Sequence, residues 1–308
     1  MAWCRSGGFL LQSTDMTASP NLPASIDTGV PELDLVWSTY AERIIQSDIL
    51  IPDTDEDLTW HAFLGHSIDM QGFRAAEFAG VDPLTKPAPA FRSLRDRGIG
   101  VPQLAALWET PRIRHHLVVG AAGTPLRSSL DMLRAEGGSD GESLADAFAA
   151  FPYRKAHWTV RALLQNSAAL AVVGYSFREW LRHECAHLGT TEFPPPDFRS
   201  LVDGPRGSIP LEMALRRRLE QTFYMVGPAL APYMICDWQL WLWKEGRTAV
   251  FANFKLDSFH EGFVDRHGEG RVPVTEQAFA DWWLDLHPTL PPRLINECIW
   301  LGVEHDLV

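Results

Sequence analysis

Hydrophobic residues recur along most of the chain at intervals of three and four positions, the spacing that places them on one face of a helix. In residues 31–49, for example, Leu33, Val36, Tyr40 and Ile44 keep this spacing. Strict alternation of apolar and polar residues, which would predict strands, is scarce. The pattern therefore predicts an all-α, single-domain helical bundle. We expect it to cover residues 30–308, behind a flexible tail at residues 1–29.

Glycines, prolines and clusters of polar residues interrupt this pattern, and they predict where the helices end. Residues 135–142, with two glycines in a row, are expected to form a polar loop, and residues 189–207 a proline-rich one. Ser208 and Pro210 are expected to open the helix that follows that loop. The expected helices are 31–49, 57–80, 89–94, 101–108, 125–135, 143–173 with a break near Pro152, 176–188, 208–226, 229–243, 248–266, 275–286 and 292–301.

Composition narrows the class of protein. Hydrophobic residues make up 46% of the 308 positions, as in ordinary globular domains, and no apolar run approaches the length of a membrane span. The first residues lack the pattern of a signal peptide, and Met16 is an alternative start, so a cytoplasmic location is the default expectation. The 12 tryptophans predict a bulky core, above all the clusters Trp238, Trp241, Trp243, Trp282 and Trp283.

The formal net charge of −12 argues against a nucleic-acid binder, whose domain normally carries a basic stripe. The short basic run Arg216-Arg217-Arg218 is more typical of a solvated helix face or a carboxylate clamp. The four cysteines have no C-x-x-C spacing, which predicts neither a disulfide framework nor a thiolate zinc site. We expect a small-molecule partner, without nucleic acid or membrane. A homodimer stays open.

Residues 183–187, His-Glu-Cys-Ala-His, form an H-E-x-x-H motif. The flanking sequence predicts that they lie on a helix. Ser176 is a suitable N-cap, Glu179 completes a capping box with it, and Gly189 is a typical C-terminal stop. Tyr175 and Trp180 are spaced for a hydrophobic staple.

On this helix Trp180, His183, Glu184 and His187 are spaced i, i+3, i+4 and i+7, which places them on one face. We expect that face to point inward, because it also carries large apolar residues. Ionisable groups on an inward face are costly unless something pairs them, and a metal ion would pair all three. Glu184 and His187 are the candidate catalytic residues.

A helical bundle commonly builds its metal site from a lone Glu on each of two helices and a Glu-x-x-His unit on each of two others. The i, i+3 spacing puts both ligands of a unit on one helix face. The chain offers two such units, one with Asp in place of Glu, and two lone carboxylates on helical segments. The candidate metal ligands are Glu184 with His187, Asp257 with His260, the lone Glu220 and, more weakly, the lone Glu77.

The run from Phe251 to His260, Phe-Ala-Asn-Phe-Lys-Leu-Asp-Ser-Phe-His, resembles the last metal-binding helix of the heme-oxygenase-like diiron oxidases and oxygenases. That family carries H-x-x-x-D-x-x-H there, preceded by a lone Glu and an earlier acidic-His unit. Asn253 stands in place of the first His, which leaves the ligand set of the second metal incomplete, so one iron stays open beside the diiron site that the family implies. The resemblance covers roughly residues 140–270.

The resemblance implies a heme-oxygenase-like bundle that binds Fe(II), one or two ions, and activates dioxygen. It implies oxidation of a small molecule such as an amino acid, by desaturation, carbon–carbon cleavage, N-oxygenation or oxidative cyclisation. His183 is then a neighbour of the ligands or an extra ligand. A substrate carboxylate could be bound by one of the nearby arginines. The candidate substrate-binding residues are Arg161, Arg178 and Arg182, with Trp180 as a pocket wall.

The same motif supports a second enzyme class, a zinc metallopeptidase or hydrolase. His183 and His187 would then bind Zn²⁺ with Glu212 or Glu220 as third ligand, and Glu184 would be the general base.

A third alternative is a helix-hairpin-helix protein resembling DNA glycosylases, based on the spacing of Gly227, Ala231, Asp257 and Gly302. Asp257 would then be the catalytic carboxylate. A pure binding or scaffold protein, without stoichiometric metal, also stays open.

Overall fold

A computed structural model describes residues 22–46, 54–68, 94–120, 124–149, 157–204, 207–246, 258–268 and 270–308. The regular structure of these residues is almost entirely helical. Their small two-stranded sheet pairs β1 (Leu201–Gly204) with β2 (Gly207–Pro210), antiparallel, with Leu201 opposite Pro210. The predicted all-α fold is therefore confirmed. One continuous hydrophobic core runs through the described residues.

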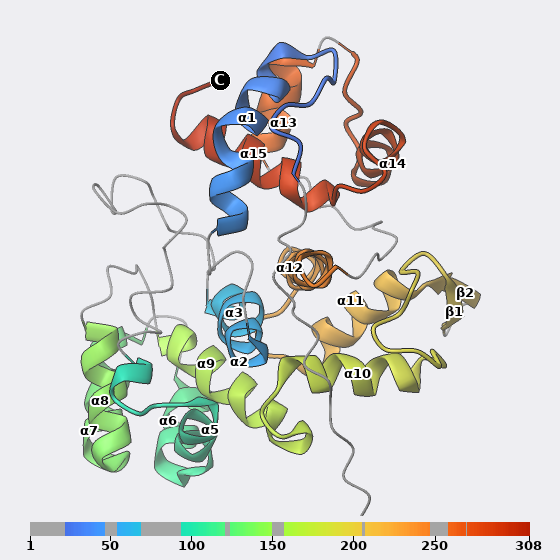
Figure 1. Cartoon of the computed structure of the whole chain (residues 1–308). Helices are drawn as coiled ribbons and strands as arrows, with labels where there is room; N and C mark the ends of the chain where they lie inside the picture. The colour runs from blue at the N-terminus through green and yellow to red at the C-terminus, as the bar shows by residue number, and fades with distance from the viewer. Residues whose placement is uncertain are drawn as a thin grey trace, which may run out of the picture.

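The helices gather into two groups with a central set between them (Figure 1). The terminal group contains α1 (Pro31–Gln46), α13 (Ser258–His267), α14 (Glu276–Leu286) and α15 (Pro292–Glu304). The second group contains α5 (Val101–Glu109), α6 (Pro111–Val119), α7 (Leu126–Glu136), α8 (Gly138–Ala149) and α9 (His157–Ala169). Helix α9 continues into the 3₁₀ turn η4 (Leu170–Val173). The central helices are α2 (Asp55–Asp57), η1 (Leu58–Gly65), α3 (His66–Ile68), α10 (Phe177–His187), α11 (Leu211–Thr222) and α12 (Ala231–Lys244).

The terminal group is held together by the packing of α1 against α15, which joins the two ends of the described chain. α1 buries the stripe that the sequence predicts, from Leu33 through Val36 and Tyr40 to Ile44. A Cβ atom at Gly302 of α15 would lie 2.4 Å from Val36 Cγ1. The glycine therefore lets the two helices approach closely.

The predicted loop at residues 135–142 is wrong, because α7 ends at Glu136 and α8 begins at Gly138. The glycines that predict a loop permit a tight helical hairpin instead. A Cβ atom at Gly141 would lie 2.2 Å from the carbonyl oxygen of Leu133, and one at Gly137 would lie 2.7 Å from the Cα of Gly141. Their absent side chains let α8 fold back onto α7.

The helix expected to open at Ser208 and Pro210 begins at Leu211 instead, because residues 207–210 form strand β2. Gly207, with φ of 112°, adopts a backbone conformation that favours glycine and closes the hairpin. The predicted helices at 176–188, 229–243, 275–286 and 292–301 agree with α10, α12, α14 and α15 to within a few residues.

Residues 58–65 form a π-helix, which the sequence pattern does not predict. Seven of its eight residues are buried, among them Trp60 and Phe63. Much of the expected helices 57–80, 89–94 and 248–266, and most of the expected tail, lies outside the described residues.

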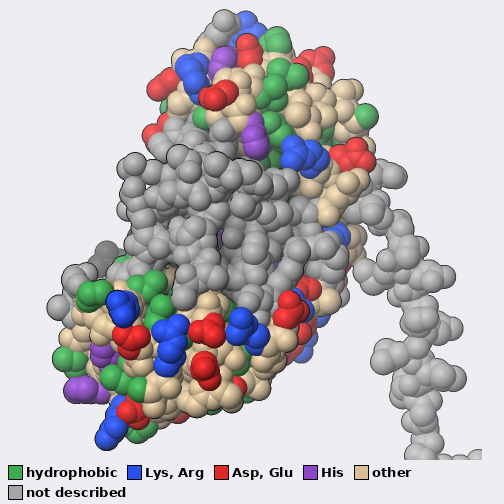
Figure 2. Space-filling model, turned by 90° about the vertical axis from the view of Figure 1, so that its left-hand side faces the viewer, with side chains coloured by type: hydrophobic (Ala, Val, Ile, Leu, Met, Phe, Trp, Pro, Cys, Tyr) green, Lys and Arg blue, Asp and Glu red, His purple; other side chains and the backbone are tan. Residues whose placement is uncertain are grey.

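The tryptophan core is confirmed, with Trp238, Trp241, Trp243 and Trp283 buried and Trp282 partly buried. Among the described residues, every helix is too short or too polar to cross a lipid bilayer. Figure 2 views the α7–α8 side, where acidic and basic side chains of the described residues alternate. Ion pairs between these helices and their neighbour join Arg134 of α7 to Asp146 of α8, and Arg112 of α6 to Glu136 of α7.

Candidate metal centre

The motif helix α10 forms as its flanking residues predict. The hydroxyl of Ser176 accepts a hydrogen bond from the backbone N–H of Glu179 at 3.2 Å, which caps the first turn. At the other end Gly189, with φ of 83°, ends the helix, and the N–H of Thr190 returns to the carbonyl of Cys185 at 3.0 Å. These two ends fix which residues of the motif face the protein.

The buried stripe of α10 consists of Phe177, Trp180, Leu181, Glu184 and Cys185. Phe177 stacks on Phe63 of η1, and Trp180 packs on Phe223 just after α11. His183 and His187 lie at the edge of this stripe and are exposed. The expectation that all three motif residues point inward is therefore wrong. Only Glu184 is buried, because the apolar stripe is centred between it and Leu181.

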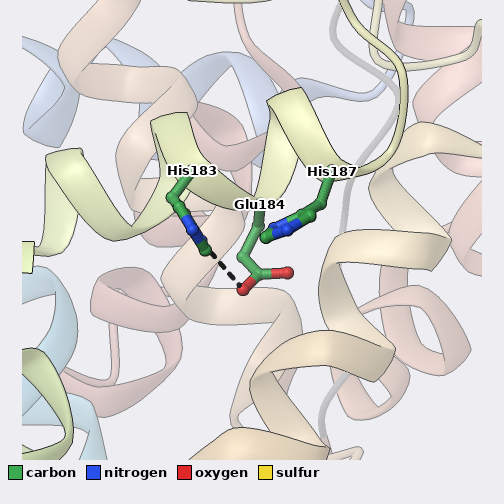
Figure 3. Close-up of side chains that lie close together, drawn as sticks. All are labelled: His183, Glu184 and His187. Atoms are coloured by element: carbon green, nitrogen blue, oxygen red, sulfur yellow. Dashed lines mark ion pairs between the residues drawn. The ribbon is translucent and has the colours of Figure 1, made fainter. Parts of the chain in front are cut away.

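His183, Glu184 and His187 nevertheless lie together on one side of α10 (Figure 3). Each offers a ligand atom, and these atoms all lie within 4.8 Å of one another. The two imidazole rings meet edge to face with centroids 4.2 Å apart. The Nδ1 atom of His183 is 3.7 Å from Oε1 of Glu184. The helix backbone alone brings the three side chains together, because His187 lies four positions after His183 and three after Glu184, and residues at these spacings are neighbours on a helix surface.

Arg218 of α11 fixes the carboxylate of this cluster. Its Nε donates a hydrogen bond to Oε2 of Glu184 at 2.6 Å, and the Glu184 side chain is 6% exposed. A guanidinium–carboxylate hydrogen bond of this length is strong and directional. The basic run Arg216–Arg218 is typical of a carboxylate clamp, but the sequence alone does not indicate that Arg218 reaches Glu184. The contact between Arg218 and the buried Glu184 depends on how α11 packs against α10, so the sequence alone does not reveal it.

The donor set suits a divalent transition metal. Two imidazoles and one carboxylate, with atoms close enough to share one ion, match the nitrogen and oxygen preferences of iron and zinc. In such a set the hydrogen bond from Arg218 to Glu184 would orient the carboxylate, as outer partners do in metal sites.

Glu220, a predicted ligand, lies on α11 two positions beyond Arg218. At about 100° per residue its side chain leaves the helix roughly 200° from that of Arg218. It is half-buried and is not part of the cluster with Glu184. Since Arg218 is the residue of α11 that meets Glu184, Glu220 faces elsewhere.

Glu212, the other carboxylate considered as a third zinc ligand, lies at the start of α11 and is buried. Burial raises the pKa of Glu212 to about 7, although the nearby Arg216 and Arg199 act to lower it. Its neighbours are thus two arginines and Glu276 rather than the histidines of α10.

His260, the predicted ligand of the second unit, lies on α13 in the terminal group, well apart from α10 in Figure 1. Its ring is buried and packs edge to face on Phe279 of α14 with centroids 4.6 Å apart. Asp257 and Glu77 lie outside the described residues. The structure therefore brings three of the predicted ligands together and leaves Glu220 and His260 apart from them.

Of the predicted substrate-binding residues, Arg182 is exposed next to the cluster, and the others are engaged in contacts within the fold. Arg178 is bound to Asp55 at 3.1 Å and lies over the Trp241 ring, and Trp180 is a core residue with 3% exposure. Arg161 lies over the ring of Tyr224. Arg182 is exposed beside His183, 3.2 Å from Glu179 and over the ring of Phe193.

No protein-family model matches this chain, and no curated protein or solved structure is significantly similar to it.

Proposed function

We propose that this protein is a non-heme iron enzyme that binds one Fe(II) through His183, Glu184 and His187 and uses dioxygen to oxidise a small carboxylate-bearing molecule. The observation that carries the proposal is the meeting of two imidazoles and one carboxylate within 4.8 Å on α10. Two histidines and one carboxylate, with open positions left over, are the donor set of non-heme iron oxygenases.

The hydrogen bond from Arg218 orients the carboxylate of Glu184 and leaves one of its oxygens available to a metal. Arg218 occupies Oε2, so Oε1, on the side of His183, is the oxygen left to face a metal held by the two imidazoles. A general base would need that same oxygen for the proton of a bound water molecule. The side chain is also buried, which restricts its motion away from the histidines.

A single metal fits the described residues better than two. His260 is in the terminal group and Glu220 faces away from Glu184, so neither supplies a second set of ligands to α10. Bound Fe(II) would supply the activation of dioxygen. The chain's own residues hold the metal, orient the carboxylate through Arg218 and bind the substrate.

Arg182 is the residue best placed to bind a substrate carboxylate. It is adjacent to His183 on α10, and about half of its side chain is exposed. Its present ion pair with Glu179 is solvent-exposed and therefore weak enough for an anionic ligand to displace. Arg178 is already held by Asp55 and Trp241.

The test is metal content by elemental analysis after anaerobic loading with iron and, separately, with zinc. We expect about one iron per chain in the wild type and loss of metal in Glu184→Gln and in His187→Ala. Glu179→Gln is the matched control, because it changes an exposed carboxylate on the same helix. His115→Ala is the control for removing an exposed histidine.

The outcomes separate the alternatives. If the wild type holds one zinc and Glu184→Gln retains it, Glu184 is a base and the protein is a hydrolase. If the wild type holds no stoichiometric metal, a binding or scaffold role replaces the enzyme. Iron binding by wild type, lost in Glu184→Gln and kept in Glu179→Gln, supports the proposal.

A second candidate is a helix-hairpin-helix protein that resembles DNA glycosylases. The observation that favours it is the turn between α11 and α12, where the carbonyl of Gly227 accepts the N–H groups of Leu230 and Ala231 at 2.9 and 3.0 Å. Asn166 holds this turn by exchanging two hydrogen bonds with the backbone of Tyr224. Asp257, its proposed catalytic carboxylate, lies outside the described residues.

The second candidate is tested by fluorescence anisotropy with a duplex oligonucleotide that carries an abasic-site analogue, at low salt. Binding that weakens in Gly227→Val and persists in Glu184→Gln would favour it over the iron enzyme. Absence of binding at low salt, where electrostatic contacts are strongest, would exclude it.

A further inference from the structure

A buried network of charged side chains joins three central and terminal elements away from α10. Asp237 of α12 accepts a hydrogen bond from Nε of Arg293 of α15 at 3.0 Å through Oδ1, and its Oδ2 lies 2.6 Å from Nε2 of His66 on α3. Arg293 also donates to Asn296 at 2.8 Å and pairs with Glu297. Asp237 and Arg293 are almost fully buried, at 4% and 3% exposure.

The charges in this network fix the proton positions on His66. A carboxylate can only accept, so Nε2 of His66 carries a hydrogen, and in the neutral form of the ring the lone pair is on Nδ1. Burial alone would raise the pKa of Asp237, but Arg293 and His66 hold it below its usual range. Asp237 therefore stays ionised and can stabilise a positive charge on the imidazole.

The surroundings hold the imidazole rigidly while leaving part of it accessible. The His66 ring stacks on Tyr233 with centroids 5.5 Å apart, and the guanidinium of Arg293 lies over the same tyrosine ring at 4.8 Å. The His66 side chain keeps 17% exposure. His66 directly follows the π-helix η1, a rare local structure that is often found at functional sites.

We propose that His66 is a general base, positioned by Asp237, at a second site that removes a proton from a hydroxyl nucleophile, water or an alcohol, attacking an ester-type carbonyl. Nδ1 of His66 takes the proton as the nucleophile's oxygen bonds to the carbonyl carbon. The bond from that carbon to the leaving alcohol breaks, and His66 returns its proton to the alcohol. This arrangement is that of a base held in one tautomer by a buried carboxylate. His66 is the catalytic residue and Asp237 the positioning residue.

The first test compares histidines within the wild-type protein, which avoids any question of folding. Diethyl pyrocarbonate acylates unprotonated imidazole nitrogens, and peptide mass spectrometry gives the rate at each histidine. His115 and His305 are exposed. If exposure alone set the rate, both would react faster than His66. We expect His66 to react at least as fast as either. A rate several-fold below both would overturn the proposal.

The second test is hydrolysis of p-nitrophenyl acetate by the full chain in a metal chelator, so that a metal at α10 does not contribute. We expect His66→Gln to lower the rate at least tenfold and His305→Gln to leave it unchanged, since a general base contributes about 10²-fold or more. Asp237→Asn should slow both acylation of His66 and hydrolysis. Equal hydrolysis by wild type and His66→Gln would overturn the proposal, whatever the metal experiments on α10 give.

Discussion

The cluster on α10 and the network around Asp237 use the same residue types in opposite ways. On α10 two exposed histidines and one buried carboxylate come from five consecutive positions, and only Arg218 joins them from elsewhere. Around Asp237 the arginine and carboxylates are buried, the histidine is half-buried, and these residues come from three distant segments. The first arrangement leaves both of its imidazoles exposed to solvent. The second joins three segments through buried charges and leaves only part of the His66 side chain accessible.

We expect the largest loss of stability when the buried network around Asp237 is disrupted. Asp237→Ala leaves the buried Arg293 guanidinium with one of its two carboxylate partners, and removing one member of a buried pair costs about 3–5 kcal/mol. We expect the free energy of unfolding to fall by that amount in urea titrations followed by circular dichroism. Asp131→Ala, which removes an exposed carboxylate, should change it by less than about 0.5 kcal/mol. Similar losses in both variants would contradict a special role for the network.

Glu212 is a buried carboxyl without such partners, so the stability of the protein should fall as this carboxyl ionises. The pKa of Glu212 rises from 4.5 to about 7, mainly through burial, and its Oε2 has no hydrogen-bond partner among the described residues. The folded state thus holds a proton that the unfolded state has released, so stability falls as pH rises from about 4.5 to about 7. The shift corresponds to roughly 3 kcal/mol at most.

Glu212→Gln should remove this loss, because the amide does not ionise. The measurement is the free energy of unfolding of both proteins at pH 5 and pH 8. We expect the variant to lose less stability than the wild type between the two pH values. Parallel pH profiles would show that Glu212 titrates normally in the folded protein.

The exposed cluster should gain stability only when metal is present. Ligand that binds the folded state alone adds about 2.7 kcal/mol at a concentration 100 times its Kd. We expect thermal unfolding of the wild type to shift upward with anaerobic Fe(II), and that of His183→Ala to shift much less. In His115→Ala the shift should equal that of the wild type. A shift of the same size in His183→Ala would place the metal elsewhere.

The smallest expected effect concerns the orientation of Glu184. Arg218→Ala keeps all three ligands but removes the group that holds Oε2, and loss of such an outer partner weakens metal binding by about 10–100-fold. Isothermal titration calorimetry measures this directly. Arg217→Ala is the matched control, since Arg217 is the neighbouring exposed arginine on α11. Equal affinity in both variants would mean that Arg218 only covers the carboxylate.

What the sequence predicts correctly in this molecule is local. Ser176 and Gly189 delimit α10, and the spacing of the motif within one helix suffices to bring His183, Glu184 and His187 together. Errors arise where one residue type serves two structures. Gly137 and Gly141 suggest a loop but permit the close α7–α8 hairpin.

Contacts between distant segments could not be predicted in this way. His66 and Asp237 are separated by 171 positions, and no pattern in either segment indicates the other. The same limit affects the candidate ligands Glu220 and His260. Their helices are predicted, but the rotation of α11 about its axis and the position of α13 in the terminal group depend on tertiary packing.

The pairing of α1 with α15 has a consequence for how the protein is made. The apolar stripe of α1 leaves the ribosome roughly 250 residues before the helix that covers it. At about 5–20 residues per second, that stripe waits on the order of ten to fifty seconds for α15. The apolar stripe of α1 therefore stays uncovered until α15 has been made, and the terminal group is the last part of the molecule able to fold.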